Sequence, residues 1–298
     1  HHNLDVDRIF IGNGSTELIH LLPRALKWRR VLIPVPSFSE YEAAAETAGC
    51  EIEFMALPEE NHFQLCLQEI LKAIRREIGA LFLCNPNNPT GHLLSKSELL
   101  PVLERAYQQG TLVVLDEAFI DYAEEASMIP ETRRYPHLIV LKSFTKFYAM
   151  PGLRVGYLVA SKEVTAQLEE IKIPWAVNHL AQVAATESLK DANYIQQSRR
   201  MMEPERRYLA ESLSEISGIR VFPSSANYLL LKFSEDLLPV EEVEGILWRE
   251  KILVRNCGSF RGMNRSYVRV AVKSRPENDR MVQRLKDLSM KQTEGTVS

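Results

Sequence analysis

The 298-residue sequence contains no apolar stretch long enough to cross a membrane, so we predict no membrane association. Its four cysteines are scattered and its seven histidines form no cluster, so no spacing typical of a metal site is present. The net charge is −3, from 36 basic and 39 acidic residues, and no basic run suggests contact with nucleic acid. With no signal peptide visible, we expect a cytoplasmic protein with reduced thiols.

Apolar segments with the length of strands alternate with amphipathic helices over the first 165 residues. The predicted strands are residues 8–11, 31–35, 52–56, 80–84, 112–115, 138–142 and 154–159, and helices are predicted at 38–48 and 95–109. This alternation predicts an α/β fold with a mostly parallel central sheet that helices cover on both faces. A ligand would then lie beyond the carboxyl ends of the strands.

A proline-containing break at residues 174–178 is followed by a different pattern. It predicts a long helix at 193–217, strands at 226–233, 252–255 and 267–272, and helices at 240–250 and 276–289. We therefore predict two domains. Residues 1–180 form a large domain, and residues 181–298, including the long connecting helix, form a smaller α+β domain.

Lys146 is the most informative residue, because it follows a buried strand together with Ser143, Thr145 and Arg154. Hydroxyl groups and a guanidinium suit a phosphate. A lysine in an apolar pocket near other cations has a lowered pKa and can attack a carbonyl as the free amine. A carbonyl compound that carries a phosphate and binds through lysine suggests pyridoxal phosphate.

Asp116 stands at the end of the predicted strand 112–115. A carboxylate there could face the pyridine nitrogen of pyridoxal phosphate and keep the ring protonated. The alternative is a helix N-cap, which is common after a strand. Asn88 lies in a rigid turn with two prolines at residues 85–91, where its amide could meet the phenolic oxygen of the cofactor; the alternative is an ordinary tight loop.

A glycine-containing segment at residues 11–17 follows the first strand and opens a helix. Glycines let the backbone approach a ligand, and the first amides of a helix face an anion. The alternative is an ordinary turn between a strand and a helix, which explains a single Gly-x-Gly about as well. The segment therefore supports a ligand site only in combination with the motifs around Lys146, Asp116 and Asn88.

Together and in this order, the four motifs resemble fold-type I pyridoxal-phosphate enzymes of the class I/II aminotransferase family, over about residues 7–288. The resemblance implies the three-layer fold of these transferases, with Lys146 holding the cofactor covalently and Asp116 pairing with its pyridine nitrogen. It also implies that Phe38 stacks on the ring and that Asn88 meets the phenolic oxygen. The residues implied for the phosphate end are Gly14, Ser15, Thr16, Ser143, Thr145 and Arg154.

The same resemblance implies a substrate-binding role for Arg269, whose guanidinium would hold a substrate carboxylate as a bidentate fork. The alternative for Arg269 is a surface charge at the edge of a strand. Arg255 and Asn178 are further candidates for substrate contact, and either could instead be structural.

Within the family, the sequence resembles threonine-phosphate decarboxylases of cobalamin biosynthesis more than histidinol-phosphate aminotransferases. Position 119 is Phe119, where the aminotransferases usually carry a tyrosine. Residues 144–154, 174–178, 226–231, 255–257 and 267–272 also match the decarboxylases. The implied reaction converts L-threonine O-3-phosphate into (R)-1-amino-2-propanol O-2-phosphate, and the alternative is amino transfer on histidinol phosphate or a related amino acid. An acyl-CoA synthase and a non-enzymatic binding module are less favoured.

The resemblance also implies a homodimer with shared active sites that acts on a small phosphorylated amino acid. Such enzymes usually carry several dozen residues before the first motif, so we expect that an N-terminal arm is missing from this chain.

Overall fold

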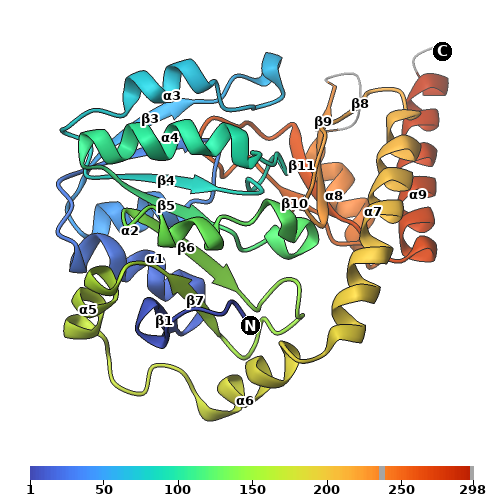
Figure 1. Ribbon diagram of the computed structural model, residues 1–298. Coiled ribbons are helices and arrows are strands. Elements are labelled where there is room, and N and C mark those ends of the chain that lie inside the picture. The colour runs from blue at the N-terminus through green and yellow to red at the C-terminus, as the bar shows by residue number, and fades with distance from the viewer. Residues whose placement is uncertain (235–238, 296–298) are drawn as a thin grey trace.

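The computed structural model describes residues 1–234 and 239–295, which form two β-sheets with helices packed around them (Figure 1). The larger sheet consists of β1 (Ile9–Gly12), β2 (Arg30–Val35), β3 (Glu51–Ala56), β4 (Ala80–Cys84), β5 (Leu112–Asp116), β6 (Leu138–Ser143) and β7 (Gly156–Val159). The smaller sheet consists of β8 (Ile219–Val221), β9 (Tyr228–Phe233), β10 (Arg255–Asn256) and β11 (Tyr267–Ala271).

The larger sheet has the strand order β1-β7-β6-β5-β4-β2-β3. Strands β2 to β6 pair in parallel, whereas β7 runs antiparallel to both β6 and β1. The predicted mostly parallel sheet is therefore confirmed. Strand β7 begins two residues later than predicted, because Arg154 adopts a left-handed φ of 57° that an extended strand does not allow.

Helices cover both faces of the large sheet, and side chains alternate between the two faces along each strand. Val114 packs in the apolar cluster beneath α1 (Gly14–Ala25), α2 (Glu40–Thr47) and α5 (Lys162–Ile171). Its neighbours Val113 and Leu115 pack in the opposite cluster, with α3 (Leu67–Ala73), α4 (Lys96–Gln109) and α6 (His179–Ser188). The continuous apolar strands seen in the sequence thus reflect burial on both sides.

The long helix α7 (Ala192–Ser214) connects the two sheets and packs with α8 (Val240–Arg249) and α9 (Arg275–Gly295) against the small antiparallel sheet. This confirms the predicted smaller α+β part of the fold. The predicted strand 252–255 is wrong, because only Arg255 and Asn256 pair with β11, opposite Arg269 and Val268. The short strand β8, which pairs with β9, was not predicted.

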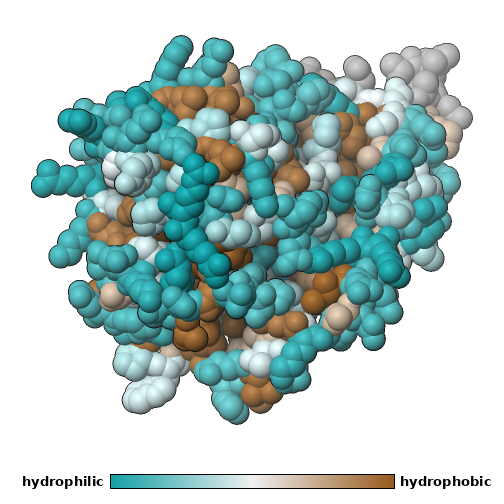
Figure 2. Space-filling view, viewed as in Figure 1, coloured by the Kyte–Doolittle hydropathy of each residue, from teal (hydrophilic) through white to brown (hydrophobic). Residues whose placement is uncertain are grey.

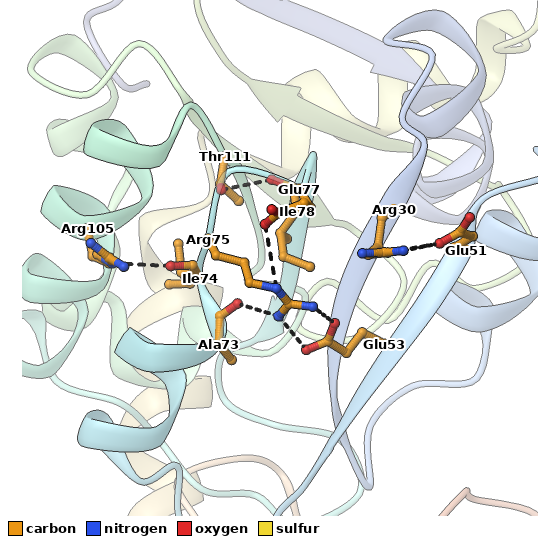
Figure 3. A network of polar contacts seen from close by, with 10 residues as sticks. All are labelled: Arg30, Glu51, Glu53, Ala73, Ile74, Arg75, Glu77, Ile78, Arg105 and Thr111. Atoms are coloured by element: carbon orange, nitrogen blue, oxygen red, sulfur yellow. Dashed lines mark hydrogen bonds and ion pairs between the residues drawn. The ribbon is translucent and has the colours of Figure 1, made fainter.

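Polar contacts at the outer edge of the large sheet join neighbouring elements (Figure 3). Arg30 and Glu51 lie opposite one another in the parallel register of β2 and β3 and form an ion pair. Arg75, which follows α3, donates to Glu53 of β3 at 2.8 Å. Because these charges are partly exposed, each pair should contribute less than about 1 kcal/mol. They hold the β3 edge in place.

Hydrophilic side chains cover most of the face shown in Figure 2. Several large apolar side chains are nevertheless exposed around the entry to α6, including Ile173, Leu180 and Val183, and Trp175 is 95% exposed. Within the described residues, no helix combines the length and apolar character needed to span a bilayer.

Candidate functional site

A cavity of about 220 Å³ lies at the carboxyl ends of the parallel strands, where the small sheet approaches the large one. The lining residues are Ser15, Thr16, Phe38, Ser39, Cys84, Asn88, Asp116, Ala118, Phe119, Ser143, Thr145, Lys146, Arg154, Arg255, Ser259, Phe260 and Arg269. Cys84, Asp116 and Ser143 come from three adjacent strands. Each lies two residues after a side chain that packs beneath α1 and α2, namely Phe82, Val114 and Leu141. Because alternate residues of a strand point to the same face, all three share the sheet face that these helices cover.

Lys146 lies in the loop after β6, with its Nζ 5.8 Å from the ring centre of Phe119. The Lys146 side chain lines the cavity, but the surrounding protein desolvates the amine and so lowers the pKa of Lys146. The positive charges of Arg269 and Arg154 lower the pKa further, whereas Asp116 opposes them. These effects shift Lys146 toward the unprotonated amine that attack on a carbonyl requires.

Asp116 is buried at the end of β5. Its Oδ1 accepts a hydrogen bond from the backbone nitrogen of Ala118 at 3.0 Å, and its Oδ2 accepts one from the Tyr41 hydroxyl at 2.7 Å. Burial raises the pKa of Asp116, while these two hydrogen bonds and the charge of Lys146 act against that rise. The N-cap alternative is wrong, since the N-cap of the following 3₁₀ helix is Phe119.

We infer an anion-binding corner where the start of α1 meets the loop after β6. The hydroxyl oxygens of Ser143 and Thr145 lie 2.8 Å apart, and both residues line the cavity with Arg154 and Ser15. Gly14 does not line the cavity, but it has a φ of 77°, and a Cβ there would come within 2.6 Å of the Arg154 guanidinium. Hydroxyls, a guanidinium and the first turn of a helix are the donors that a phosphate needs.

Gly156, at the start of β7, was missed by the sequence reasoning. A Cβ at this position would come within 2.5 Å of the Ser15 backbone nitrogen and 2.9 Å of the Lys142 carbonyl oxygen. Both are backbone atoms, one in α1 and one in β6, so a Cβ would fit only if α1 or β6 moved away from β7. Gly156 therefore allows the α1 end of the anion-binding corner to sit directly against the sheet.

We expect Gly156→Ala to destabilise the protein by roughly 1–3 kcal/mol through overpacking and to weaken phosphate-end binding of the cofactor. Thermal unfolding and cofactor titration would measure both effects. Gly152→Ala is the matched control, because a Cβ there meets nothing within 4 Å. Equal melting temperatures for the two variants would contradict the prediction.

Arg269, on β11, lines the same cavity and contacts one side chain from the loop after β4 and one from β9. Its Nη1 donates to Asn88 Oδ1, and its guanidinium carbon lies 4.7 Å from the ring centre of Tyr228. The alternative of a strand-edge charge is wrong, because β11 lies between β10 and β9. Since the Asn88 oxygen accepts this bond, its amide nitrogen keeps both hydrogens for other acceptors.

The two weaker substrate candidates occupy different places. Arg255 lines the cavity and donates to Ser259 Oγ at 3.1 Å. Asn178 is not among the lining residues. Its side-chain oxygen accepts from the backbone nitrogen of Ala181 as the N-cap of α6, and its amide donates to the Leu153 carbonyl oxygen. For Asn178 the structure therefore supports the structural alternative.

Several lining residues were not predicted as site residues. Cys84 is the last residue of β4, as Asp116 is of β5, so the argument from strand ends predicts both positions. Burial raises the pKa of the Cys84 thiol, which agrees with the interpretation of this residue as a small buried group. Ser259 and Phe260 follow β10 in a loop with no sequence signal, and only the approach of the two sheets brings them to the cavity.

The residues present fit pyridoxal phosphate. An amine with a lowered pKa and a buried carboxylate share one cavity with a hydroxyl and guanidinium corner and with the aromatic ring of Phe38. These are the groups that would bind, respectively, the aldehyde, the pyridine nitrogen, the phosphate and the ring face.

The family model described as aminotransferase class I and II matches residues 1–285. The chain belongs to this family. It is therefore a pyridoxal-phosphate-dependent enzyme of the class I/II type. Its fold is that of the pyridoxal-phosphate-dependent transferases, as the sequence predicted.

Relatives within the class I/II family point in two functional directions. The chain is 37% identical to a threonine-phosphate decarboxylase from Salmonella typhimurium, over 97% of this chain and 79% of that protein. A histidinol-phosphate aminotransferase structure from Clostridium acetobutylicum matches with a TM-score of 0.89 at 33% identity, covering 95% and 84% of the two chains. An L-threonine-O-3-phosphate decarboxylase structure from Porphyromonas gingivalis matches with a TM-score of 0.85 at 28% identity, covering 96% and 85%.

Proposed function

We propose that this enzyme decarboxylates L-threonine O-3-phosphate to (R)-1-amino-2-propanol O-2-phosphate, as a step of cobalamin biosynthesis. The observation that carries the proposal is Phe119, whose ring lies 5.8 Å from Lys146 Nζ and packs edge-on against Tyr228 at 5.0 Å. This side chain offers no hydroxyl beside the lysine, where the aminotransferases of the family usually carry a tyrosine. The similarity to the Salmonella decarboxylase supports the same assignment.

The charges of the cavity fit a substrate with two anionic groups. Arg255 and Arg269 line it in addition to Arg154, which the cofactor phosphate would occupy. L-Threonine phosphate carries a carboxylate and a phosphate, and a guanidinium binds either one through a bidentate fork. We assign the substrate carboxylate to Arg269 and propose that Arg255 contacts the substrate phosphate.

A histidinol-phosphate aminotransferase is the second candidate. It is favoured by the solved structure from Clostridium acetobutylicum, and glutamate, as an amino donor, would also present two anions to these arginines. Histidinol phosphate itself has a phosphate but no carboxylate, so it would leave one of the two guanidiniums without an anionic partner.

Bound pyridoxal phosphate supplies an electron sink for the pair released when a bond to the substrate α-carbon breaks. Asp116 would keep the pyridine nitrogen protonated, and the corner of Ser143 and Arg154 would hold the phosphate. Arg269 would orient the carboxylate so that its bond to the α-carbon is the one that breaks and carbon dioxide leaves. The Lys146 amine would take up a proton from the amino group of the substrate and pass it to the α-carbon, where it replaces the carboxylate that leaves as carbon dioxide.

We expect one equivalent of carbon dioxide per site when cofactor-loaded protein meets L-threonine phosphate in a single turnover. The amine product should keep the phosphate, and the absorbance spectrum should return to its starting form. Released carbon dioxide and the spectrum would be followed together. Conversion to pyridoxamine phosphate without carbon dioxide, followed by turnover of histidinol phosphate, would contradict the decarboxylase and establish the second candidate.

The homodimer with shared sites, implied by the family resemblance, stays a prediction.

A further inference from the structure

Tyr41, on α2, is a buried residue that contacts two of the proposed cofactor-binding residues. Its hydroxyl donates to Asp116 Oδ2 at 2.7 Å. Its ring stacks on Phe82 with centroids 5.1 Å apart and an interplanar angle of 12°, and it meets Phe38 edge-on at 5.7 Å. Tyr41 is only 1% exposed, so neither ring nor hydroxyl has room to turn away.

This packing makes Tyr41 a fixed donor. Burial raises the pKa of its hydroxyl, so the group stays protonated and donates to the carboxylate. Asp116 is thereby held at both oxygens, because the Ala118 backbone nitrogen binds the other one. A carboxylate held at two points keeps one orientation, while its remaining lone pairs are free to meet a ligand in the cavity that Asp116 lines.

We propose that Tyr41 is a positioning residue that fixes the Asp116 carboxylate for the pyridine nitrogen and ties it to the ring-stacking Phe38. This inference rests on the proposed cofactor role of Asp116 and adds to it. It does not depend on which reaction the enzyme catalyses. Through the Tyr41 side chain, α2 would set the position of Asp116, at the edge of the pyridine ring, relative to Phe38, on the face of that ring.

The Tyr41 hydroxyl should also affect how cofactor binding depends on pH. A hydrogen bond to a carboxylate favours its ionised form, so removing the Tyr41 hydroxyl should raise the pKa of Asp116 further. Asp116 must be ionised to pair with a protonated pyridine nitrogen. In the variant, cofactor affinity should therefore begin to fall at a higher pH as the solution is acidified.

The other titratable groups that face Asp116 are Cys84 from β4, Lys146 after β6 and Tyr228 from β9. Burial raises the pKa of both the Cys84 thiol and the Tyr228 hydroxyl, so these two stay neutral over the range tested. Lys146 is positively charged at acidic pH and favours the ionised carboxylate, which acts in the same direction as Tyr41. Tyr41→Phe also removes the hydrogen bond between the Tyr41 hydroxyl and the Cys84 thiol, which lowers the pKa of that thiol, so Cys84 stays neutral in the variant as well.

The test is a double-mutant cycle of Tyr41→Phe and Asp116→Asn, read as the dissociation constant of pyridoxal phosphate over a pH series. In the Asp116 background, Tyr41→Phe should weaken binding roughly 10- to 100-fold, the size of a hydrogen bond to a charged group. In the Asp116→Asn background it should change binding little, because a neutral amide cannot form the charged pair with the pyridine nitrogen, whichever way the Tyr41 hydroxyl orients it. Tyr135→Phe is the matched control, since it removes a hydroxyl bonded to Glu104 at 2.7 Å, away from the cavity.

A loss of the same factor in both backgrounds would show that Tyr41 acts only through packing and would overturn the proposal. So would unchanged affinity and an unchanged pH profile in the single variant. Cofactor affinity is measured without substrate, so failure of the proposed decarboxylation would leave this test intact. A pH profile that shifts only when Asp116 is present is the expected result.

Discussion

Lys146→Ala should lose covalent attachment of the cofactor and reduce turnover roughly a thousandfold or more. The substitution removes both the nucleophile and the proposed proton donor, and a positioned proton donor alone contributes about 10²- to 10⁴-fold. The spectrum of the loaded protein, its mass after borohydride treatment and single-turnover carbon dioxide release would measure the effect.

Lys190→Ala is the control for this result, because Lys190 is exposed and pairs only with the neighbouring Glu187 among the contacts described. It should keep the attached cofactor and normal turnover. A Lys146→Ala protein that still gains the cofactor mass after borohydride treatment would show that another residue forms the link, and the assignment of Lys146 would be wrong.

Arg269→Ala should lower kcat/KM for L-threonine phosphate by roughly a hundredfold to a thousandfold, as expected when one partner of a hydrogen-bonded charge pair is lost. It should also raise the pKa of Lys146, since the nearby guanidinium charge helps to lower it. The free amine would then form at a higher pH, and an alkaline shift in the pH dependence of cofactor attachment to the apoprotein would report this.

Arg269→Lys separates the two effects of Arg269. It keeps a positive charge, so the pH profile should stay near that of the original enzyme, but an ammonium cannot form the bidentate fork and kcat/KM should still fall. Arg265→Ala is the control, because Arg265 is largely exposed and pairs with Glu241. Unchanged kcat/KM in Arg269→Ala would remove the carboxylate-binding role.

The site residues that were predictable from the sequence are those at strand ends. Asp116 and Ser143 follow apolar strands, and parallel strands bring their carboxyl ends to one edge, so local pattern placed them together. Strand parity also predicts that Cys84 lies on the same face. Arg269 needed the family resemblance, because spacing alone could not distinguish a cavity residue from an edge charge.

The errors came from segments without periodic signal. Residues 252–254 have the composition of a strand, but they do not pair with β11, although β11 continues to Ala271, beyond the partner of Arg255. Asn178 was chosen as a substrate candidate from a resembling motif, whereas its side chain caps α6. In both places the outcome depended on which neighbour the chain meets, and composition does not contain that information.

By itself, the sequence determined the alternation of strands and helices, the mostly parallel sheet and the position of Lys146 after a buried strand. These features depend on the spacing of apolar residues over short segments of the chain. Only the tertiary structure decided that the Tyr41 hydroxyl meets Asp116, which lies 75 residues away, and that Arg255 joins Arg154 at one cavity. These contacts exist because α2 packs on the large sheet against β2 and β3, and because the small sheet approaches the strand ends. The chemistry of the site follows from that packing as much as from its residues.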